Sequence, residues 1–283
     1  MFKKNKKKYP KIGVAFSGGS ALGIAHVGVI KALMKNKIPI DFVSGTSAGA
    51  VAAVCVAFGV PLKKMIEVSE RLSWSNVSRF GYSKMGLNSN RPVGEIIKEL
   101  IGDVRIEDAY IPLAIVAANI DTGEEVVLRK GSVAEAVMAS TCLPALFIPI
   151  KIKGKKLVDG GLVENLPLSP LKKMGAQLKI GVNLGHWRTL KKSHNILEVI
   201  TNSYSILTRT QQAFIPGQAE ILIEPHLEKF TSSDFKKADA LMDEGYRAAS
   251  LMIGEIKKRL NPEKEEVASF FEKIANFFKA APK

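Results

Sequence analysis

Short apolar runs that suit β-strands alternate with longer segments that suit helices along most of this chain. The strand-like runs lie at 12–16, 40–43, 113–120, 179–184 and 221–223, and the helix-like segments at 21–36, 48–58, 195–212 and 235–260. Strands that are apolar at nearly every position are typical of a parallel sheet with helices on both faces. We therefore predict one domain at 11–260, an α/β fold of three layers (α/β/α) with a mostly parallel central sheet.

The two ends of the chain differ from this pattern. Residues 1–10 are rich in lysine and predict a solvated basic tail, with contact to an anionic membrane as the alternative. After Asn261 and Pro262, apolar side chains recur every three or four residues, which predicts an amphipathic helix within 261–283. We expect its apolar face to be buried against the domain, against a second subunit in an oligomer, or in a lipid interface.

Composition and charge narrow the class of protein. With 283 residues, 46% of them hydrophobic, the chain can build a substantial core, which excludes disorder for most of it. The formal net charge of +14 favours anionic partners. A nucleic-acid partner is not expected, because no helix-turn-helix pattern, zinc-ligand pattern or aromatic stacking strand accompanies the charge.

The apolar segments and the cysteines indicate a cytoplasmic protein, with peripheral membrane contact left open. No apolar segment of the signal-peptide kind follows the lysine-rich start. The uncharged stretch at 42–62 is interrupted by glycines and a proline, so we predict a buried helix there rather than a membrane span. Cys55 and Cys142 lie in apolar surroundings and are expected to be buried free thiols.

The first candidate for chemistry is the sequence Gly45-Thr46-Ser47-Ala48-Gly49, between a predicted strand and a predicted helix. A serine on such a tight turn projects its hydroxyl above the carboxyl edge of the sheet, and the glycines avoid a clash where strand and helix nearly touch. Backbone amides at the start of the helix add positive potential where an attacked carbonyl develops negative charge. We predict that Ser47 is a catalytic nucleophile.

The second candidate is the glycine-rich loop at 17–23, again between a strand and a helix. Ser20 stands where a dinucleotide fingerprint needs its second glycine, and no Gly-Lys-Ser/Thr sequence closes the loop as a phosphate loop requires. Consecutive glycines can still turn their amides toward an anion. We expect the amides of Gly18, Gly19 and Ser20 to form an oxyanion hole.

The third candidate is Asp159, which follows a short strand at 156–158 and precedes Gly160 and Gly161. A serine nucleophile needs a base within hydrogen-bond reach, and an aspartate next to glycines can be approached closely by another loop. With the ordinary pKa of about 3.9 an aspartate is a weak base at neutral pH. We therefore expect placement and oxyanion stabilisation to supply most of the catalysis.

The histidines leave an alternative open. His26 falls on the helix after the glycine loop and is expected to pack in the core, whereas the other three histidines fall in loops or at the ends of elements. The chain order Ser47, Asp159, His186 would also fit the Ser-Asp-His triad of an α/β-hydrolase. A second alternative is a non-hydrolytic module, in which the glycine loop binds phosphate and Ser47 is structural.

Together and in this order, the three motifs resemble the patatin-like phospholipase family over about residues 11–260. The glycine loop resembles the family's oxyanion loop, 45–49 its nucleophile elbow, and the sequence Asp159-Gly160-Gly161 its aspartate motif. Further similar stretches lie at 23–29, 136–149 and 162–167. The resemblance implies a three-layer α/β/α fold that hydrolyses acyl esters of phospholipids and other lipids with a Ser-Asp dyad and no histidine.

The resemblance also implies a role for each motif residue. Ser47 would be the nucleophile, Asp159 the base, and the amides of Gly18, Gly19 and Ser20 the oxyanion hole. The motifs would be supported by five further glycines: Gly23, Gly45, Gly49, Gly160 and Gly161. The expected substrate is a lipid or other acyl ester, and no metal ion or cofactor is expected.

The chain departs from the family's pattern at two positions of the glycine loop. Ser20 stands where many members have a glycine, and Leu22 stands where many have an arginine or lysine. A serine can present the same backbone amide, so the oxyanion hole is expected to survive. The missing cation removes one contact to a phosphate, which affects headgroup preference more than ester cleavage.

Substrate access is predicted from two further segments. Trp74, Phe80, Tyr82 and Met85, with glycines among them, are interpreted as a mobile apolar segment that lines an acyl channel or forms a lid, the alternative being a surface loop packed on the core. The basic and aromatic segment at 186–192 is interpreted as a contact for an anionic headgroup.

Overall fold

The computed structural model describes residues 9–185, 192, 196–211, 213, 215 and 217–261. The predicted basic tail, apart from its last two residues, and the predicted C-terminal helix, apart from Asn261, lie outside the described residues. The same is true of His186 and His194, and of the segment at 186–192 apart from Lys192.

A mostly parallel sheet forms the centre of the domain, as the apolar runs predict. Its strands are ordered β11-β10-β1-β2-β5-β9-β8, and β6 also pairs with β5. The parallel strands are β1 (Ile12–Phe16), β2 (Phe42–Thr46), β5 (Leu113–Asn119), β10 (Leu178–Val182) and β11 (Ile221–Ile223). The antiparallel strands are β6 (Glu125–Leu128), β8 (Ile150–Ile152) and β9 (Lys155–Asp159).

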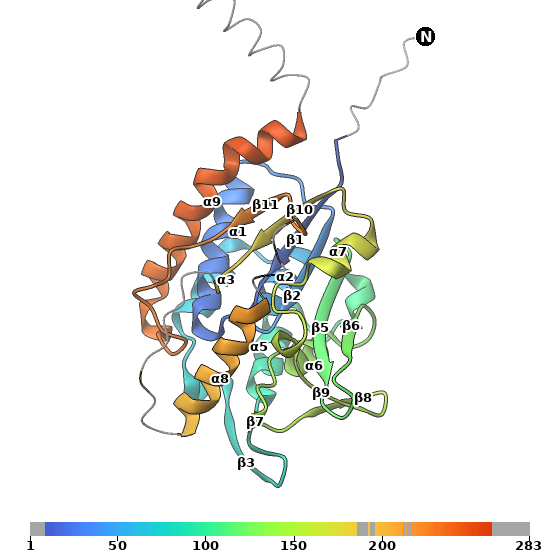
Figure 1. Cartoon of the computed structure of the whole chain (residues 1–283), viewed down its shortest axis with the longest axis vertical. Coiled ribbons are helices and arrows are strands. Elements are labelled where there is room, and N and C mark those ends of the chain that lie inside the picture. Colours follow the sequence, from blue (N-terminus) through green and yellow to red (C-terminus); the bar gives the residue numbers. More distant parts are fainter. Residues whose placement is uncertain are drawn as a thin grey trace, which may run out of the picture.

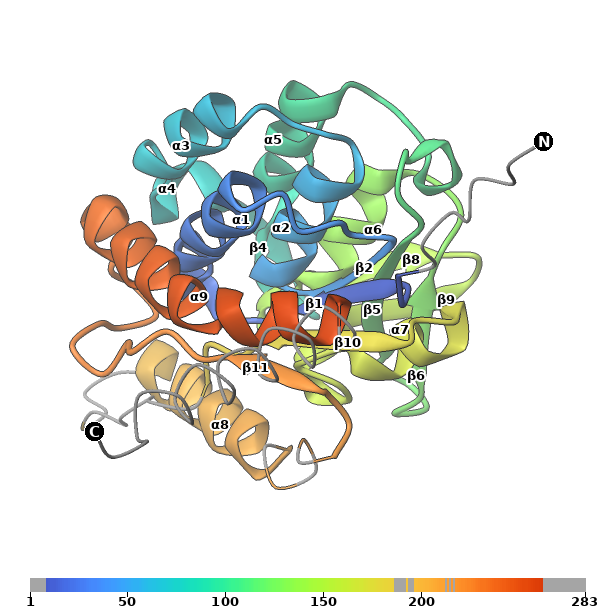
Figure 2. The same ribbon diagram turned by 90° about the horizontal axis from the view of Figure 1, so that it is seen from above.

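Helices cover both faces of the sheet, which confirms the three-layer architecture (Figure 1). Figure 2 shows one face covered by α1 (Ala25–Lys35), α2 (Ala48–Ala57), α6 (Val133–Ser140) and α9 (Ala238–Leu260), with α3 (Leu62–Glu70), α4 (Trp74–Val77) and α5 (Arg91–Ile101) farther out. The opposite face carries α7 (Leu168–Met174) and α8 (Ile196–Gln211). Short 3-10 turns complete the chain: η1 (Ser20–Ile24), η2 (Ile106–Asp108), η3 (Gly160–Leu162) and η5 (Phe235–Lys237).

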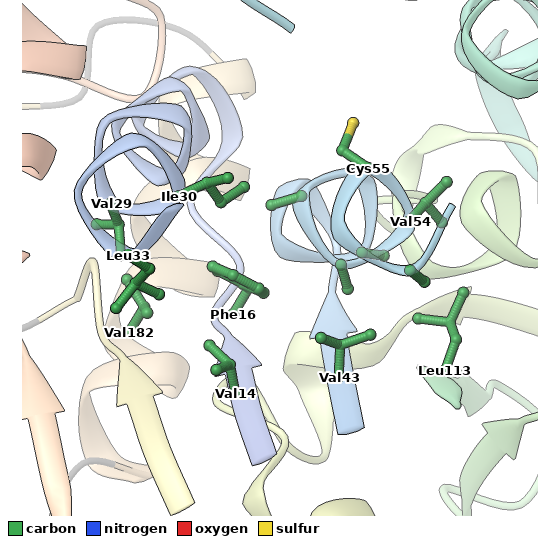
Figure 3. Packing of buried hydrophobic residues seen from close by; sticks show 14 of the residues in the cluster. Val14, Phe16, Val29, Ile30, Leu33, Val43, Val54, Cys55, Leu113 and Val182 are labelled. Atoms are coloured by element: carbon green, nitrogen blue, oxygen red, sulfur yellow. The ribbon is translucent and has the colours of Figure 1, made fainter. Parts of the chain in front are cut away.

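The largest part of the core lies between the sheet and the helices α1 and α2. Val14, Phe16 and Val43 of the strands are fully buried against these helices (Figure 3). Each such side chain stabilises the fold by roughly 1.5–3 kcal/mol relative to its exposed state. Figure 3 also shows Cys55 on the side of α2 that faces away from the strands. Both cysteines are free and buried, as the sequence predicts.

The strand that precedes Ser47 differs slightly from the prediction. It begins at Phe42 rather than at residue 40 and continues through Gly45 and Thr46, so it leads directly into the serine. The side chain of Asp41 accepts a 2.8 Å hydrogen bond from the amide of Ile12, which fixes the chain at the point where β2 enters the sheet. The strands at 12–16 and 221–223 have the predicted bounds.

A small second sheet was not predicted. The strands β3 (Arg79–Ser83) and β4 (Gly86–Ser89) form an antiparallel hairpin, and β4 pairs with β7 (Ala145–Phe147). Phe80 and Met85 on this hairpin are 85% and 46% exposed and do not line the cavity described below, whereas Trp74 does. Trp74 belongs to α4 and not to the hairpin, so this apolar segment does not line the cavity as one unit.

The uncharged stretch at 42–62 forms β2, the buried helix α2 and the start of α3, as expected from its glycines and proline. Among the helices in the described ranges, none combines the length and the apolar character needed to cross a bilayer.

Candidate active site

Ser47 stands on a strained turn between β2 and α2. Its φ of 54° and ψ of −126° lie in a region that costs a residue other than glycine about 1–3 kcal/mol. Gly45 and Gly49 make the turn possible, because a Cβ on Gly45 would lie 2.3 Å from the carbonyl oxygen of Gly49, and a Cβ on Gly49 would lie 2.1 Å from that of Phe16. The predicted elbow is therefore present, with its serine at the start of a helix.

The backbone of this turn is anchored from α6. The amide of Ser47 donates a 2.8 Å hydrogen bond to the hydroxyl of Ser140, which in turn donates to the carbonyl of Val116 at 2.6 Å. All three groups are buried. The strained turn is thereby tied to the central strand β5, which explains the position of Ser140 at the end of α6.

The ends of β2 and β9 bring Ser47 and Asp159 together. β6 pairs with β5 from Ile115 to Ala118, while β2 pairs with 113–116 and β9 with 117–119. Because β6 occupies one edge of β5, β2 and β9 share the other edge, where they run toward each other. Thr46 is opposite Val116 and Asp159 opposite Ala117, so the nucleophile and the carboxylate follow at neighbouring positions.

Asp159 is completely buried, and one of its oxygens is already occupied. Oδ1 accepts hydrogen bonds from the amide of Gly161 at 2.9 Å and from the hydroxyl of Tyr204 at 2.7 Å. Oδ2 is buried with no hydrogen bond of normal geometry from the described residues. Burial raises the pKa of Asp159 to about 6, against the lowering effect of hydrogen bonds from Ser47, Gly161 and Tyr204. The carboxylate is thus a stronger base than the sequence alone suggests.

The glycines after Asp159 allow two close approaches. A Cβ on Gly160 would lie 2.3 Å from the carbonyl oxygen of Val116, and a Cβ on Gly161 would lie 1.7 Å from the hydroxyl oxygen of Tyr204. The first approach holds the turn against β5. The second admits a side chain from the helix α8, whereas the element expected to approach Asp159 was a loop.

The glycine-rich loop lies beside Ser47, but its amides are not equivalent. The amide of Gly18 donates to the carbonyl of Asn165 at 3.1 Å and is therefore not available to an oxyanion, which corrects the expectation for this residue. The amides of Gly19 and Ser20 have no hydrogen-bond acceptor within the part of the chain that the structure describes. Ser20 has a φ of 53°, a left-handed conformation that costs a serine roughly 1–2 kcal/mol.

Gly23 supports the loop in the expected way. A Cβ at this position would lie 2.4 Å from the Cβ of Ala48, so only a glycine lets η1 pack on the first turn of α2. The loop and the elbow are thereby held against each other.

An apolar cavity of about 160 Å³ has Ser47 in its wall and is lined by residues of α1, α2, α3 and α5. Its wall is almost entirely hydrophobic and includes Val27, Ile30, Val51, Cys55, Met65 and Ile97. Trp74 also lies in this wall and packs edge-on against Phe235, with 5.5 Å between the ring centroids. A cavity with this lining suits a hydrocarbon chain.

A second, much smaller pocket of about 20 Å³ opens on the polar side of Ser47. It is lined by Gly19, Ser20, Ser47, Leu143, Thr201, Tyr204 and Ser232. This volume is sufficient for about one water molecule.

Sequence reasoning missed the part of α8 in this site. Tyr204 contacts Asp159, and the side chain of Gln211 donates to the carbonyl of Gly161 at 2.8 Å and accepts from the amide of Asn165 at 2.9 Å. The available signal was a set of polar residues at helical spacing: Thr201, Tyr204, Ser205, Thr208 and Gln211.

The described histidines do not approach Asp159 or Ser47 through any hydrogen bond. His26 is fully buried, and its Nε2 donates to the carbonyl of Ser17 at 2.8 Å, which confirms the expected structural role. Burial lowers the pKa of His26 to about 4. His226 lies 3.9 Å from Glu228 at the surface. No group of three or more side chains suited to hold a metal ion lies in the described ranges.

In a comparison with known proteins, all three motifs fall within the match to one family. The model of the patatin-like phospholipase family matches residues 14–172, which include the glycine loop, Ser47 and Asp159. An uncharacterized NTE family protein of Mycobacterium tuberculosis is 30% identical over 178 residues, 62% of this chain and 49% of its own length. The lysophospholipase NTE1 of Yarrowia lipolytica is 32% identical over 180 residues, 62% of this chain and 13% of its own length.

This chain therefore spans about half the length of the mycobacterial relative, and less of the yeast one. Among solved structures, VipD from Legionella pneumophila superimposes with a TM-score of 0.50 at 15% identity, over 88% of this chain and 67% of VipD. At that identity the superposition shows a common fold.

Proposed function

Because the chain belongs to the patatin-like phospholipase family, we propose that it hydrolyses lipid acyl esters with Ser47 as the nucleophile and Asp159 as the base. The meeting of β2 and β9 end to end along β5 carries this proposal, because it puts a strained serine and a buried carboxylate at neighbouring positions. Three groups of the site have one role each: Asp159 takes the proton, Ser47 forms the new bond, and the glycine loop stabilises the oxyanion.

In the first step, Oδ2 of Asp159 accepts the hydroxyl proton of Ser47 while the serine oxygen attacks the ester carbonyl. The amides of Gly19 and Ser20, with the N-terminus of α2, are the donors available for the negative charge on the carbonyl oxygen. Return of the proton to the leaving alcohol breaks the ester bond and leaves an acyl-serine.

In the second step, a water molecule in the small pocket beside Ser47 attacks the acyl-serine. Asp159 again takes the proton from water and then returns it to the serine oxygen as the bond between that oxygen and the acyl carbon breaks, which releases the fatty acid and restores the hydroxyl of Ser47. The room of about 20 Å³ in this pocket supports the idea that one water, and not bulk solvent, reaches the acyl group.

The apolar cavity supports a long acyl chain as the part of the substrate that is recognised. Since its lining is apolar, and since a relative is named a lysophospholipase, lysophospholipids and other single-chain esters are the substrates that we propose. Leu22 is fully buried and carries no charge, so it offers no contact to a phosphate.

The test compares Ser47→Ala and Asp159→Asn with the unaltered protein on a p-nitrophenyl acyl ester and on a lysophospholipid. We expect both variants to lose hydrolysis, and a fluorophosphonate probe to label the unaltered protein at Ser47 but not the Ser47→Ala variant. Full activity in either variant, or no labelling of Ser47, would reject the dyad.

A control variant addresses the triad alternative. His186→Ala is expected to keep its activity, because Asp159 takes the proton directly from Ser47. A loss of activity as large as that of Asp159→Asn would favour a Ser-Asp-His triad instead.

A further inference from the structure

The helix α8 is turned with its polar side toward the active site and apolar side chains toward solvent. Ser205 and Thr208 are buried, whereas Val199 and Ile206 are each 51% exposed. A helix that covers a hydrophobic core has the opposite arrangement. The inward face of α8 is therefore matched to a polar site, and Asp159 is a charged group that it contacts directly.

Two side chains of α8 bind the turn that carries Asp159. Tyr204 donates to Oδ1 of the carboxylate at 2.7 Å, and Gln211, about two helical turns further on, donates to the carbonyl of Gly161 at 2.8 Å. Gln211 also accepts the amide of Asn165 at 2.9 Å. The helix thus holds the carboxylate and the backbone that follows it.

The contact between Tyr204 and Asp159 requires a glycine at position 161. A Cβ on Gly161 would lie 1.7 Å from the hydroxyl oxygen of Tyr204 and 2.6 Å from the ring carbon that bears it. Any larger residue there would displace the tyrosine from Asp159. The second glycine of the aspartate motif and Tyr204 are therefore one structural unit.

We propose that Tyr204 is a positioning residue for Asp159: its hydroxyl occupies Oδ1 and thereby keeps Oδ2 directed at Ser47. This inference rests on the proposed function. It adds a residue of α8, which lies outside the residues 14–172 that match the family model. The phenol acts on the reaction through the carboxylate and not by contact with the acyl group.

The effect of Tyr204 on Asp159 can be measured as a shift in the pKa of the carboxyl group. The carboxylate has hydrogen-bond partners in the amide of Gly161 and the hydroxyls of Ser47 and Tyr204, and its charge acts electrostatically on the thiol of Cys142. No lysine, arginine or histidine of the described ranges contributes to its pKa. A hydrogen bond to the charged form of a carboxyl group lowers its pKa, so loss of the Tyr204 donor should raise the pKa of Asp159 by about one unit or more.

The experiment measures kcat/KM against pH for the unaltered protein, Tyr204→Phe and Tyr110→Phe. Tyr204→Phe keeps the ring and removes the donor, and Tyr110 is an 83% exposed tyrosine that serves as the matched control. We expect the acidic limb of the profile to move by about one pH unit toward higher pH in Tyr204→Phe only, with a lower plateau. An acidic limb at the same pH as in the unaltered protein overturns the proposal.

A second variant tests the same unit from its other side. Gly161→Ala should displace Tyr204 and shift the acidic limb in the same direction. In the double variant with Tyr204→Phe the shifts should not add, because both changes remove the same hydrogen bond. Fully additive shifts contradict a shared mechanism.

A stability measurement keeps the proposal testable without turnover. The hydrogen bond stabilises the ionised carboxylate, so Tyr204→Phe should lose more unfolding free energy at pH 8 than at pH 5. A purely structural tyrosine would cost the same at both pH values, and that result overturns the proposal. If Ser47→Ala is fully active, the proposed function fails; if it is inactive and the Tyr204→Phe profiles do not move, only the role of Tyr204 fails.

Discussion

The amide of Ser47 donates a 2.8 Å hydrogen bond to the hydroxyl of Ser140, 93 residues further along the chain. The hydroxyl of Ser140 in turn donates a hydrogen bond to the carbonyl of Val116 in β5. One buried hydroxyl therefore connects the strained turn to the centre of the sheet. Strain at a functional position persists only when the surrounding structure over-determines it. Ser140 supplies part of that constraint for the nucleophile.

Replacing Ser140 by alanine should therefore weaken both the fold and the elbow. The buried amide of Ser47 would lose its acceptor, at a cost of about 1–3 kcal/mol in unfolding free energy. We expect kcat to fall roughly tenfold, since a misplaced nucleophile that raises the barrier by about 1.4 kcal/mol has this effect. Chemical denaturation and ester hydrolysis provide the two measurements.

The matched control is Ser205→Ala, which removes another buried serine, whose hydroxyl donates within its own helix to the carbonyl of Thr201. This variant should lose less stability than Ser140→Ala. Equal effects of the two substitutions would mean that Ser140 has no special relation to the elbow.

Asp159→Asn should make the protein more stable at neutral pH while it removes activity. The folded-state pKa of Asp159 is raised from 3.8 to about 6, so above pH 6 the ionised carboxylate costs about 3 kcal/mol of stability. This cost decreases as pH falls below 6 and is absent below about 3.8. The stabilising effect of the asparagine should therefore be largest at pH 7–8 and disappear in acid, as measured by urea unfolding at several pH values.

An asparagine can still accept both hydrogen bonds of Oδ1, from Gly161 and from Tyr204, which makes it a suitable isostere. Ser44→Ala, at another buried polar position of the same sheet, provides a comparison without a titrating group. A variant Asp159→Asn that is less stable than the unaltered protein at every pH would contradict the raised pKa.

His26 should contribute a loss of stability in acid. Its pKa falls from 6.5 to about 4 on folding, so the unfolded chain binds the proton first and stability decreases as pH falls through this window. The contribution amounts to about 3 kcal/mol between pH 6.5 and 4. Relative to the unaltered protein, His26→Gln should therefore gain stability as pH falls, because a glutamine donates a hydrogen bond without titrating.

Comparing His26→Gln with the unaltered protein isolates the effect of the histidine on stability, because both proteins have the same carboxylates. Unfolding free energies at pH 7 and pH 4 are the required measurements. A constant difference between the two proteins over this range would show that His26 is not buried as a neutral ring.

Cys55→Phe should shorten the acyl chain that the protein accepts. Cys55 lies in the wall of the apolar cavity, eight residues after Ser47 on α2, or roughly 12 Å along the helix axis. A phenyl ring there fills the far part of the cavity. We expect kcat/KM for palmitoyl esters to fall at least tenfold and that for butyryl esters to stay within about twofold, since each buried methylene contributes about 0.8 kcal/mol.

Cys55→Ala is the control, because it removes the thiol without filling the cavity. Burial raises the pKa of Cys55 to about 12, so the thiol does not act as a nucleophile. Its loss should therefore leave kcat/KM for both esters unchanged. An equal fall for short and long chains in Cys55→Phe would place the acyl chain elsewhere.

The sequence by itself determined the class of the fold and the identity of the main candidates. Apolar runs at strand spacing, helices between them, and small residues around Ser47 and Asp159 are local features, and each was enough to indicate the element that it forms. The buried position of His26 followed in the same way from its place on the helix after the glycine loop. The cytoplasmic location, the basic tail and the C-terminal helix stay predictions.

Only the tertiary structure decided how these parts meet. That β9 runs against β2 on the same edge of β5 depends on pairing between strands far apart in the chain, which no local pattern encodes. Contacts between distant segments and burial likewise decide three further features: the hydrogen bond of the Gly18 amide to Asn165, the raised pKa of Asp159 and the contact of Tyr204. The sequence shows which side chains are candidates for the site. The low dielectric and the distances that determine their chemistry exist only once the chain is folded.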